Sequence, residues 1–344
     1  MHKPRIRVWN VNLMLTAVLL AAFVVSLMLG TANVPFVTTL KALAYRLFGW
    51  VEPDPLKTAA SIIVDIRLPR VLTAAVIGAA LAVSGAAMQG LLKNPLADGS
   101  IMGISSGGTL GAVLYLGFGQ FLPALSGFGT ALSSMLFSFL SLLLILALAW
   151  RFDRGMSTNT MILLGVVFSM LTGSLTSLVV SFAGSDMEHL VFWMMGSLGG
   201  SSFGKLLWLA PLSVACILFI TARSDELNAF SLGEEQAAYI GVNTKAVKIQ
   251  VMVAVAILIG AAVSVSGVIG FVGLIPPHIV RLFTGSNHRK LMPATALFGA
   301  AFLMLADLLS RTLTRTGIPI GVVTSLVGSL LFLYLFNTLR KKAA

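Results

Sequence analysis

Long apolar runs separated by short polar stretches make up most of this sequence. A helix needs about 20 consecutive apolar residues to cross the hydrocarbon core of a bilayer. Runs of about that length recur along the whole chain. The pattern therefore predicts an all-α integral membrane protein with about ten transmembrane helices, at about 11–30, 62–92, 99–118, 122–149, 158–183, 203–222, 245–269, 271–283, 290–313 and 320–340.

Two polar stretches interrupt this pattern. Residues 184–202 are too polar at one end to cross a membrane but keep the apolar spacing of a short helix, so we expect a half-helix on the outer side. Residues 224–244 form the longest polar insert on the inner side, and they predict two short helices. Ser231, followed three residues later by Glu234, has the spacing of a capping box at the start of the second helix.

The composition agrees with a membrane location. The 344 residues are 57% hydrophobic and 10% charged, with a mean hydropathy of +0.97. Soluble domains carry charge on about a quarter of their residues. We therefore treat residues 1–344 as a single transmembrane domain. The single cysteine, Cys216, excludes an intrachain disulfide bond.

The distribution of positive charge predicts the orientation. A net charge of +11 would suggest nucleic-acid binding in a soluble protein. Here the basic residues lie in short loops beside apolar runs, where they favour the cytoplasmic side. An even number of spans returns the chain to the side where it began. We expect a lipid partner, no nucleic acid, and both termini in the cytoplasm, because basic residues occur at both ends of the chain: Lys3, Arg5, Arg7, Arg340, Lys341 and Lys342.

An internal repeat relates the two halves of the chain. The segment 78–85 (GAALAVSG) recurs at 260–267 (GAAVSVSG), with six of the eight positions identical. Each copy is followed by a polar break that contains proline, at Asn94-Pro95 and at Pro276-Pro277. In the predicted threading the two copies run in opposite directions, which is typical of the inverted repeats of transport proteins. A chance match between small-residue helix faces is the alternative.

The charged residues inside the spans limit the type of transport. Asp307 is the one carboxylate well inside an apolar run, and Arg311 follows at the i, i+4 spacing of an ion pair. The chain has no phosphate-binding loop of the Gly-x-x-x-x-Gly-Lys-Ser/Thr type, so ATP would have to be hydrolysed on another subunit. The four histidines show no metal-ligand spacing. An ATP-driven permease and an ion-coupled secondary transporter remain the two classes.

Several motifs in order resemble the permease subunits of ferric-siderophore and cobalamin ABC importers, the FecCD-type family. The resemblance extends from about residue 60 to the end of the chain and rests on the segments 67–70 (RLPR), 78–90, 94–97 (NPLA), 103–107 (GISSG), 193–199, 232–234 (LGE), 267–274, 277–281 and 318–322. It implies the type II ABC importer permease fold and a protein that is not itself an enzyme.

The resemblance also implies the partners and the cargo. Such a permease pairs with a second permease, identical or related, and binds two ABC ATPase subunits inside and a substrate-binding protein outside. ATP and Mg²⁺ would lie on the ATPases, with no cofactor or metal on this chain. The implied location is a prokaryotic cytoplasmic membrane. The implied cargo is an iron–siderophore complex, with cobalamin and haem as alternatives.

The resemblance assigns roles at both membrane surfaces. Contacts to the ATPase are expected from Leu232, Gly233, Glu234, Glu235, Ala238 and Gly241. A solvated loop is the alternative there. Docking of the binding protein is expected from Arg67, Arg70 and Arg311, with Arg315 as a weaker candidate. Anchoring of these arginines in lipid headgroups is the alternative.

The resemblance further implies gate and path residues, namely Asn94, Leu96, Ser157, Thr158, Asn159, Ser105 and Ser106. Helix capping by Asn94 and Ser157 is an equally good interpretation of those two residues. The segment 103–107 also fits the Gly-x-Ser-x-Gly pattern of serine hydrolases, with His278 as a remote partner for Ser105. That pattern carries weight only in a strand–turn–helix context.

Overall fold

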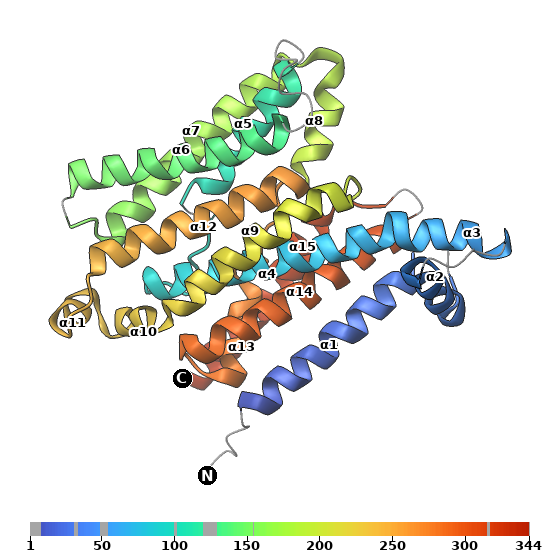
Figure 1. The fold of residues 1–344 in the computed structure, drawn as a ribbon. Coiled ribbons are helices and arrows are strands. Elements are labelled where there is room, and N and C mark those ends of the chain that lie inside the picture. The colour runs from blue at the N-terminus through green and yellow to red at the C-terminus, as the bar shows by residue number, and fades with distance from the viewer. Residues whose placement is uncertain are drawn as a thin grey trace.

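The protein is a bundle of helices, shown in Figure 1. The computed structural model describes residues 8–30, 34–48, 54–99, 102–119, 129–153, 155–314 and 317–343. The elements of the first half are α1 (Val8–Met28), α2 (Phe36–Phe48), α3 (Asp54–Ala60), the π-helix η1 (Ser61–Arg67), α4 (Leu68–Leu91), α5 (Ile104–Phe118), α6 (Gly129–Phe152) and α7 (Thr158–Ser181). Those of the second half are η4 (Gly184–Asp186), α8 (Met187–Met194), α9 (Phe203–Ala222), α10 (Ser224–Leu232), α11 (Glu234–Tyr239), α12 (Thr244–Ser266), α13 (Ile275–Thr284), α14 (His288–Thr312) and α15 (Ile320–Ala343).

Each of the ten predicted segments contains a helix in this structure. Among the residues that the structure describes, seven helices are long and apolar enough to cross a membrane, and α5 and the first part of α15 are shorter apolar helices. The half-helix expected within 184–202 is α8, and the insert at 224–244 forms α10 and α11. Helices α2 and α3 were not predicted, since polar Thr38, Thr39 and Lys41 interrupt the apolar residues of α2.

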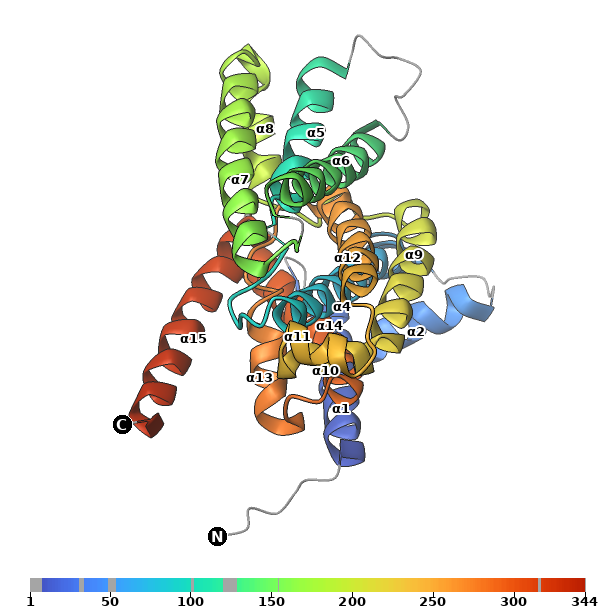
Figure 2. The same cartoon turned by 90° about the vertical axis from the view of Figure 1, so that its left-hand side faces the viewer.

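The helices divide into a central group and a peripheral group. In the apolar windows of α12 and of the continuous helix Leu56–Leu91, 78% of the residues are buried, and in α14 67% are buried. In α1, α6, α7 and α9 the share is 17–28%. Apolar side chains that remain exposed on a membrane helix face lipid or another membrane subunit. Helices α4, α12 and α14 thus form the core, as Figure 2 shows from a second direction.

The packing of the central helices reproduces the repeat found in the sequence. Helix α4 of the first half packs on α14 of the second, α12 of the second packs on α6 of the first, and α9 contacts both α4 and α12. The glycines of the repeat permit this approach. A Cβ atom on Gly85 would lie 1.8 Å from the carbonyl oxygen of Gly273, and one on Gly78 would lie 2.3 Å from that of Gly299. The pairs α4–α14 and α12–α6 thus each join one half to the other, and α4 and α12 run in opposite directions through the bundle (Figure 1), as an inverted repeat requires.

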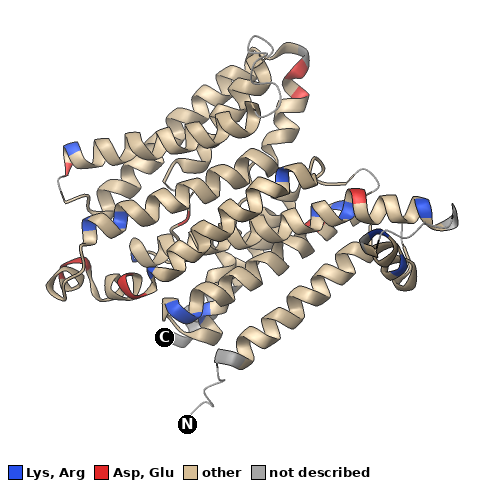
Figure 3. Cartoon of the chain, in the orientation of Figure 1, with Lys and Arg blue, Asp and Glu red and all other residues tan. Residues whose placement is uncertain are grey.

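The bundle has two distinct ends. Helix α1 begins and α15 ends toward the same end of the bundle as α10, α11 and α13, and we name this the α11 end (Figure 1). Helices α2, α3 and α8 lie at the opposite end, named here the α3 end. Charged residues gather toward these two ends, with long uncharged helix segments between them (Figure 3). The structure thus presents two polar surfaces joined by an apolar bundle.

Candidate functional site

The helices α10 and α11 form an exposed surface at the α11 end. Gly233 joins them with φ +130°, a conformation that favours glycine. Three apolar side chains are exposed on this surface, and none of them belongs to a membrane-spanning helix. Leu232, Tyr239 and Ile240 are 66%, 88% and 64% exposed. Glu235, Ala238 and Gly241 are exposed as well. We call these six residues the α11 surface. It places three exposed apolar side chains beside one carboxylate, that of Glu235, and an apolar centre with polar groups at its edge is typical of a protein interface.

The capping box expected at the start of α11 does not form. Ser231 lies inside α10, and its hydroxyl donates to the carbonyl oxygen of Leu227 at 3.4 Å. The N-cap of α11 is Gly233, without a side-chain cap. The prediction was wrong because α10 continues to Leu232, so that Ser231 is not at the start of a helix, and because the carboxylate of Glu234 is bound by another partner.

That partner is Lys248, in the second turn of α12. Its Nζ atom lies 2.6 Å from the carboxylate of Glu234. The side chain of Lys248 is only 1% exposed, and that of Glu234 is 38% exposed. We expected Glu234 to be as open to a partner as Glu235. In the structure its carboxylate turns inward and fastens α11 to α12.

The same ammonium group reaches the segment that precedes α7. Nζ of Lys248 donates to the carbonyl oxygen of Met156 at 3.0 Å. The candidate gate residues Ser157, Thr158 and Asn159 follow directly. These residues were assigned to the gate without reference to Lys248. In the structure, the buried ammonium group of Lys248 binds both the residue that precedes them and Glu234 of α11.

Asp153 organises the segment between α6 and α7. Its carboxylate accepts hydrogen bonds from the backbone N–H groups of Gly155 (3.0 Å) and Ser157 (2.9 Å) and from the hydroxyl of Thr160 (3.2 Å). Hydrogen bonding lowers the pKa of Asp153 to about 2. The hydroxyl of Ser157 makes the largest contribution, followed by the two backbone N–H groups. Ser157 occupies the N-cap position, but its side chain caps no backbone N–H and instead contacts the Thr160 hydroxyl at 3.0 Å. The sequence did not indicate this role of Asp153, because the residue lies several positions before the first residue of α7, Thr158.

The other candidate gate residues lie on two further elements. The Oδ1 atom of Asn94 accepts a hydrogen bond from the N–H of Leu96 at 2.9 Å, which closes a turn after α4 and does not cap a helix. Leu96 is 45% exposed. Ser105 and Ser106 are half-buried in the first turn of α5. Asn94 and Leu96 thus lie on the turn after α4, whereas the two serines lie in a helix.

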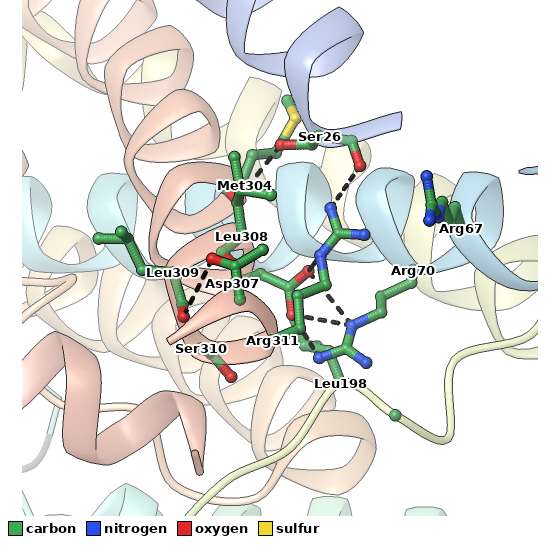
Figure 4. A network of polar contacts seen from close by, with 12 residues as sticks. Ser26, Arg67, Arg70, Leu198, Met304, Asp307, Leu308, Leu309, Ser310 and Arg311 are labelled. Carbon is green, nitrogen blue, oxygen red and sulfur yellow. Dashed lines mark hydrogen bonds and ion pairs between the residues drawn. The ribbon is translucent and has the colours of Figure 1, made fainter. Parts of the chain in front are cut away.

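The three candidate docking arginines converge at the α3 end (Figure 4). Nη1 of Arg67 donates to the carbonyl oxygens of Leu27 (2.7 Å) and Met28 (2.8 Å), at the end of α1. Arg311 donates to the carbonyl oxygen of Ser26. Arg67 and Arg311 are buried, and the side chain of Arg70 is 21% exposed. In this conformation Arg70 is the most exposed of the three and offers the most surface to a partner.

Asp307 holds two of these arginines. Its carboxylate lies 2.8 Å from Nη2 of Arg70 and 3.4 Å from Nε of Arg311, and it is 1% exposed. The ion pair expected from the spacing of Asp307 and Arg311 is therefore confirmed, with Arg70 as an additional member. Arg315, the weaker candidate, lies outside the described residues.

A cavity of about 600 Å³ adjoins this network. Arg70 and Arg311 line it together with His189 and Trp193 of α8 and Lys205 in the first turn of α9. The cavity is basic and partly aromatic. Two of the three docking arginines, Arg70 and Arg311, thus border a space at the α3 end that is large enough for a small ligand or an inserted side chain.

The FecCD transport family matches residues 18–338, which is nearly the whole chain. The chain belongs to the FecCD transport family. It is 41% identical over 285 residues to the hemin transport system permease HmuU of Yersinia pestis, with 81% of this chain and 84% of the relative covered. It is 38% identical over 287 residues to the cobalamin import system permease BtuC of Halobacterium salinarum, with 83% and 76% covered.

A solved structure supports the same assignment. It shows an inward-facing conformation of a metal-chelate type ABC transporter, with a TM-score of 0.83 and 33% sequence identity, and the match covers 96% of this chain and 99% of that one. The FecCD chain described here is therefore an ABC importer permease that crosses the membrane several times. In such systems ATP is hydrolysed on separate subunits, and the permease works within a complex with ATPase and permease partners.

Membership of the FecCD family sets aside two alternatives considered for the sequence. An ion-coupled secondary transporter does not fit, and the mid-span carboxylate of Asp307 is already paired with two arginines. A serine hydrolase does not fit either, because the part of the chain that the structure describes contains no strand to carry a strand–turn–helix around Ser105. Among the described residues, no group of three His, Cys, Asp or Glu side chains is placed to hold a metal ion.

Proposed function

We propose that this FecCD permease moves an iron–siderophore complex inward across a prokaryotic cytoplasmic membrane. The structural match to a metal-chelate type ABC transporter supports an iron chelate. The relatives named for hemin and cobalamin support those cargoes as the second candidates. All three are large ligands, and the cavity at the α3 end adjoins basic groups that suit an anionic chelate.

In this proposal the α11 end faces the cytoplasm. Basic residues at both ends of the sequence favour that side under the positive-inside rule. Helix α1 begins and α15 ends at the α11 end, so the two termini share it. The α3 end, with Arg70 and the cavity, then faces the substrate-binding protein.

The single observation that carries the mechanism is the α11 surface. Leu232, Tyr239 and Ile240 are exposed and lie outside the helices that are long and apolar enough to cross a membrane. Exposed apolar groups beside charged ones are typical of a protein partner. We assign the partner as an ABC ATPase, one of two in the complex, which holds ATP and Mg²⁺. A second permease subunit, identical or related, completes the path.

In this proposal the permease alternates between two states, one with its outer gate open and one with its inner gate open. Transport follows when nucleotide binding changes the relative stability of these two states. Nucleotide binding moves the ATPases, and the α11 surface passes that movement to the segments 94–96 and 157–159. A ligand shifts such an equilibrium only by its different affinity for the two states. The binding protein acts at the other end through carboxylates that compete with Asp307 for Arg70.

Co-purification with the cognate ATPase tests the α11 surface. Glu235→Arg reverses an exposed charge on this surface without touching the ion pair of Glu234. We expect the variant to lose most of the ATPase that the wild type retains on an affinity column. Glu188→Arg, an exposed reversal on α8 at the α3 end, is the matched control and should retain it. Failure of the wild type to bind any ATPase would contradict the proposal.

The cargo is tested in proteoliposomes that contain the permease, its ATPase and its binding protein. A radiolabelled ferric siderophore, hemin and cobalamin are offered in parallel, with ATP inside the vesicles or with none. We expect ATP-dependent accumulation of the ferric siderophore. Accumulation of hemin or cobalamin alone would replace the cargo and leave the importer assignment in place.

A further inference from the structure

The buried lysine Lys248 joins three elements that are distant in the sequence. It belongs to α12, its ammonium binds the Glu234 carboxylate of α11 at 2.6 Å, and it donates to the Met156 carbonyl oxygen at 3.0 Å. Burial of an ammonium group is costly unless hydrogen-bonded partners surround it. Both partners adjoin residues to which the proposed function gives a role. Glu234 precedes Glu235 of the α11 surface, and Met156 precedes the candidate gate residue Ser157.

The segment bound through Met156 is internally rigid. Asp153 fastens it through its bonds to the N–H groups of Gly155 and Ser157 and to the hydroxyl of Thr160. The N–H of Met156 in turn donates to the carbonyl oxygen of Asp153 at 2.8 Å. A displacement of the Met156 carbonyl group therefore moves the whole turn and the first residues of α7 with it.

The connection is also specific. Within the described part of the chain, no other side-chain hydrogen bond or ion pair joins α11 to residues 153–160. The neighbouring Lys245, three residues earlier on α12, is exposed and lies over the ring of Trp150 at 5.9 Å instead. The two lysines thus differ in burial and in what they connect, although both carry the same charge.

We propose that Lys248 is the positioning residue that transmits movement of the α11 surface to the gate segment at the start of α7. This inference rests on the proposed function, in which an ATPase acts on α11. When the ATPase shifts α11, Glu234 moves the ammonium group, and the ammonium group moves the turn at Met156. Lys248 itself contacts neither cargo nor nucleotide.

The test measures how nucleotide changes the accessibility of two positions in the complex of permease and ATPase. Asn159→Cys reports on the start of α7 and Gln236→Cys on α11, beside the α11 surface but not part of it, and both side chains are exposed. Each is introduced with Cys216→Ser, which removes the single native thiol. The rate of reaction with a maleimide is followed with and without ATP and vanadate.

Four versions of Lys248 and its neighbours are compared. Lys248→Met combined with Glu234→Gln removes the link and leaves no buried unpaired charge, so that the fold is kept. Lys248→Arg retains the charge and should restore the link. Lys245→Met is the matched control on the same helix. The unmodified chain is the reference.

In the reference, the arginine variant and the control, we expect nucleotide to change the labelling rate at position 159 by about fivefold or more, as in coupled sites. In the double variant this change should disappear, while position 236 still responds to nucleotide. A full nucleotide response at position 159 in the double variant would overturn the inference. If position 236 is not protected by the ATPase in any version, the proposed function fails instead, so the two failures are distinguishable.

Discussion

The two ends of the bundle hold their buried charges in opposite ways. At the α11 end one cation, Lys248, binds one carboxylate that is partly exposed, and their charges balance. At the α3 end a single buried carboxylate, Asp307, pairs with Arg70 and Arg311, while Arg67 binds backbone carbonyl groups of α1 nearby. The second network keeps an excess of two positive charges.

The difference suits the two proposed tasks. A balanced pair has little attraction for further ions, so it can join two moving elements without drawing other groups between them. A network with excess positive charge attracts carboxylates from a partner, which steers association. Loss of the central residue should also have different consequences. Without Lys248, the partly exposed carboxylate of Glu234 can be hydrated. Without Asp307, the cations of Arg70 and Arg311 are left unpaired in a largely buried site.

The largest effect is expected from Asp307→Asn. It leaves Arg70 and Arg311 without a counter-charge in a site where the carboxylate is 1% exposed. Breaking a buried ion pair by removing one partner costs about 3–5 kcal/mol of folding free energy. The unfolding midpoint in detergent measures it. The control Asp65→Asn removes an exposed partner of Arg46, at 3.2 Å, and should cost no more than about 1 kcal/mol. Equal losses in the two variants would contradict the comparison.

A smaller loss of stability is expected from Lys248→Met. The carboxylate of Glu234 left behind is 38% exposed and can be hydrated, and the methionine fills the space of the lysine stem. The loss of hydrogen bonds to a charged group corresponds to about 1–3 kcal/mol. Unfolding in the same detergent measures it, with Lys245→Met as the control. A loss larger than that of Asp307→Asn would reverse the ranking of the two ends.

The smallest effect concerns Asp153 and depends on pH. Its pKa of about 2 lies below the ordinary value of about 3.9 for an aspartate in an unfolded chain. Its contribution to stability is therefore complete above about pH 4 and is lost as the pH falls toward 2. The difference in unfolding midpoint between the wild type and Asp153→Asn should narrow over that range. A difference that stays constant down to pH 2 would show that the carboxylate charge contributes nothing.

The sequence predicted the features that depend on local periodicity or spacing. The apolar runs, the half-helix α8 and the pair Asp307–Arg311 all lie within one segment each, and the structure contains them. The repeat was recognisable because small residues recur where α4 and α12 approach their neighbours closely.

The parts that the sequence did not predict depend on contacts between distant segments. Arg70 joins Asp307 across 237 positions, and Lys248 reaches Met156 across 92. In the sequence, Lys248 is one more basic residue near the start of a span. The expected capping box failed for the same reason, because a partner from another helix competes for Glu234. The roles of the gate and docking residues stay predictions.

The pairing of Arg70 with Asp307 has a consequence for biogenesis. A ribosome adds about 5–20 residues each second, so the 237 positions between these two residues take about 10–50 s to synthesise. During that interval Arg70 has entered the bilayer without the carboxylate that finally pairs with it. The network at the α3 end can close only after α14 has been made, and the contact that holds the arginines therefore forms late in synthesis.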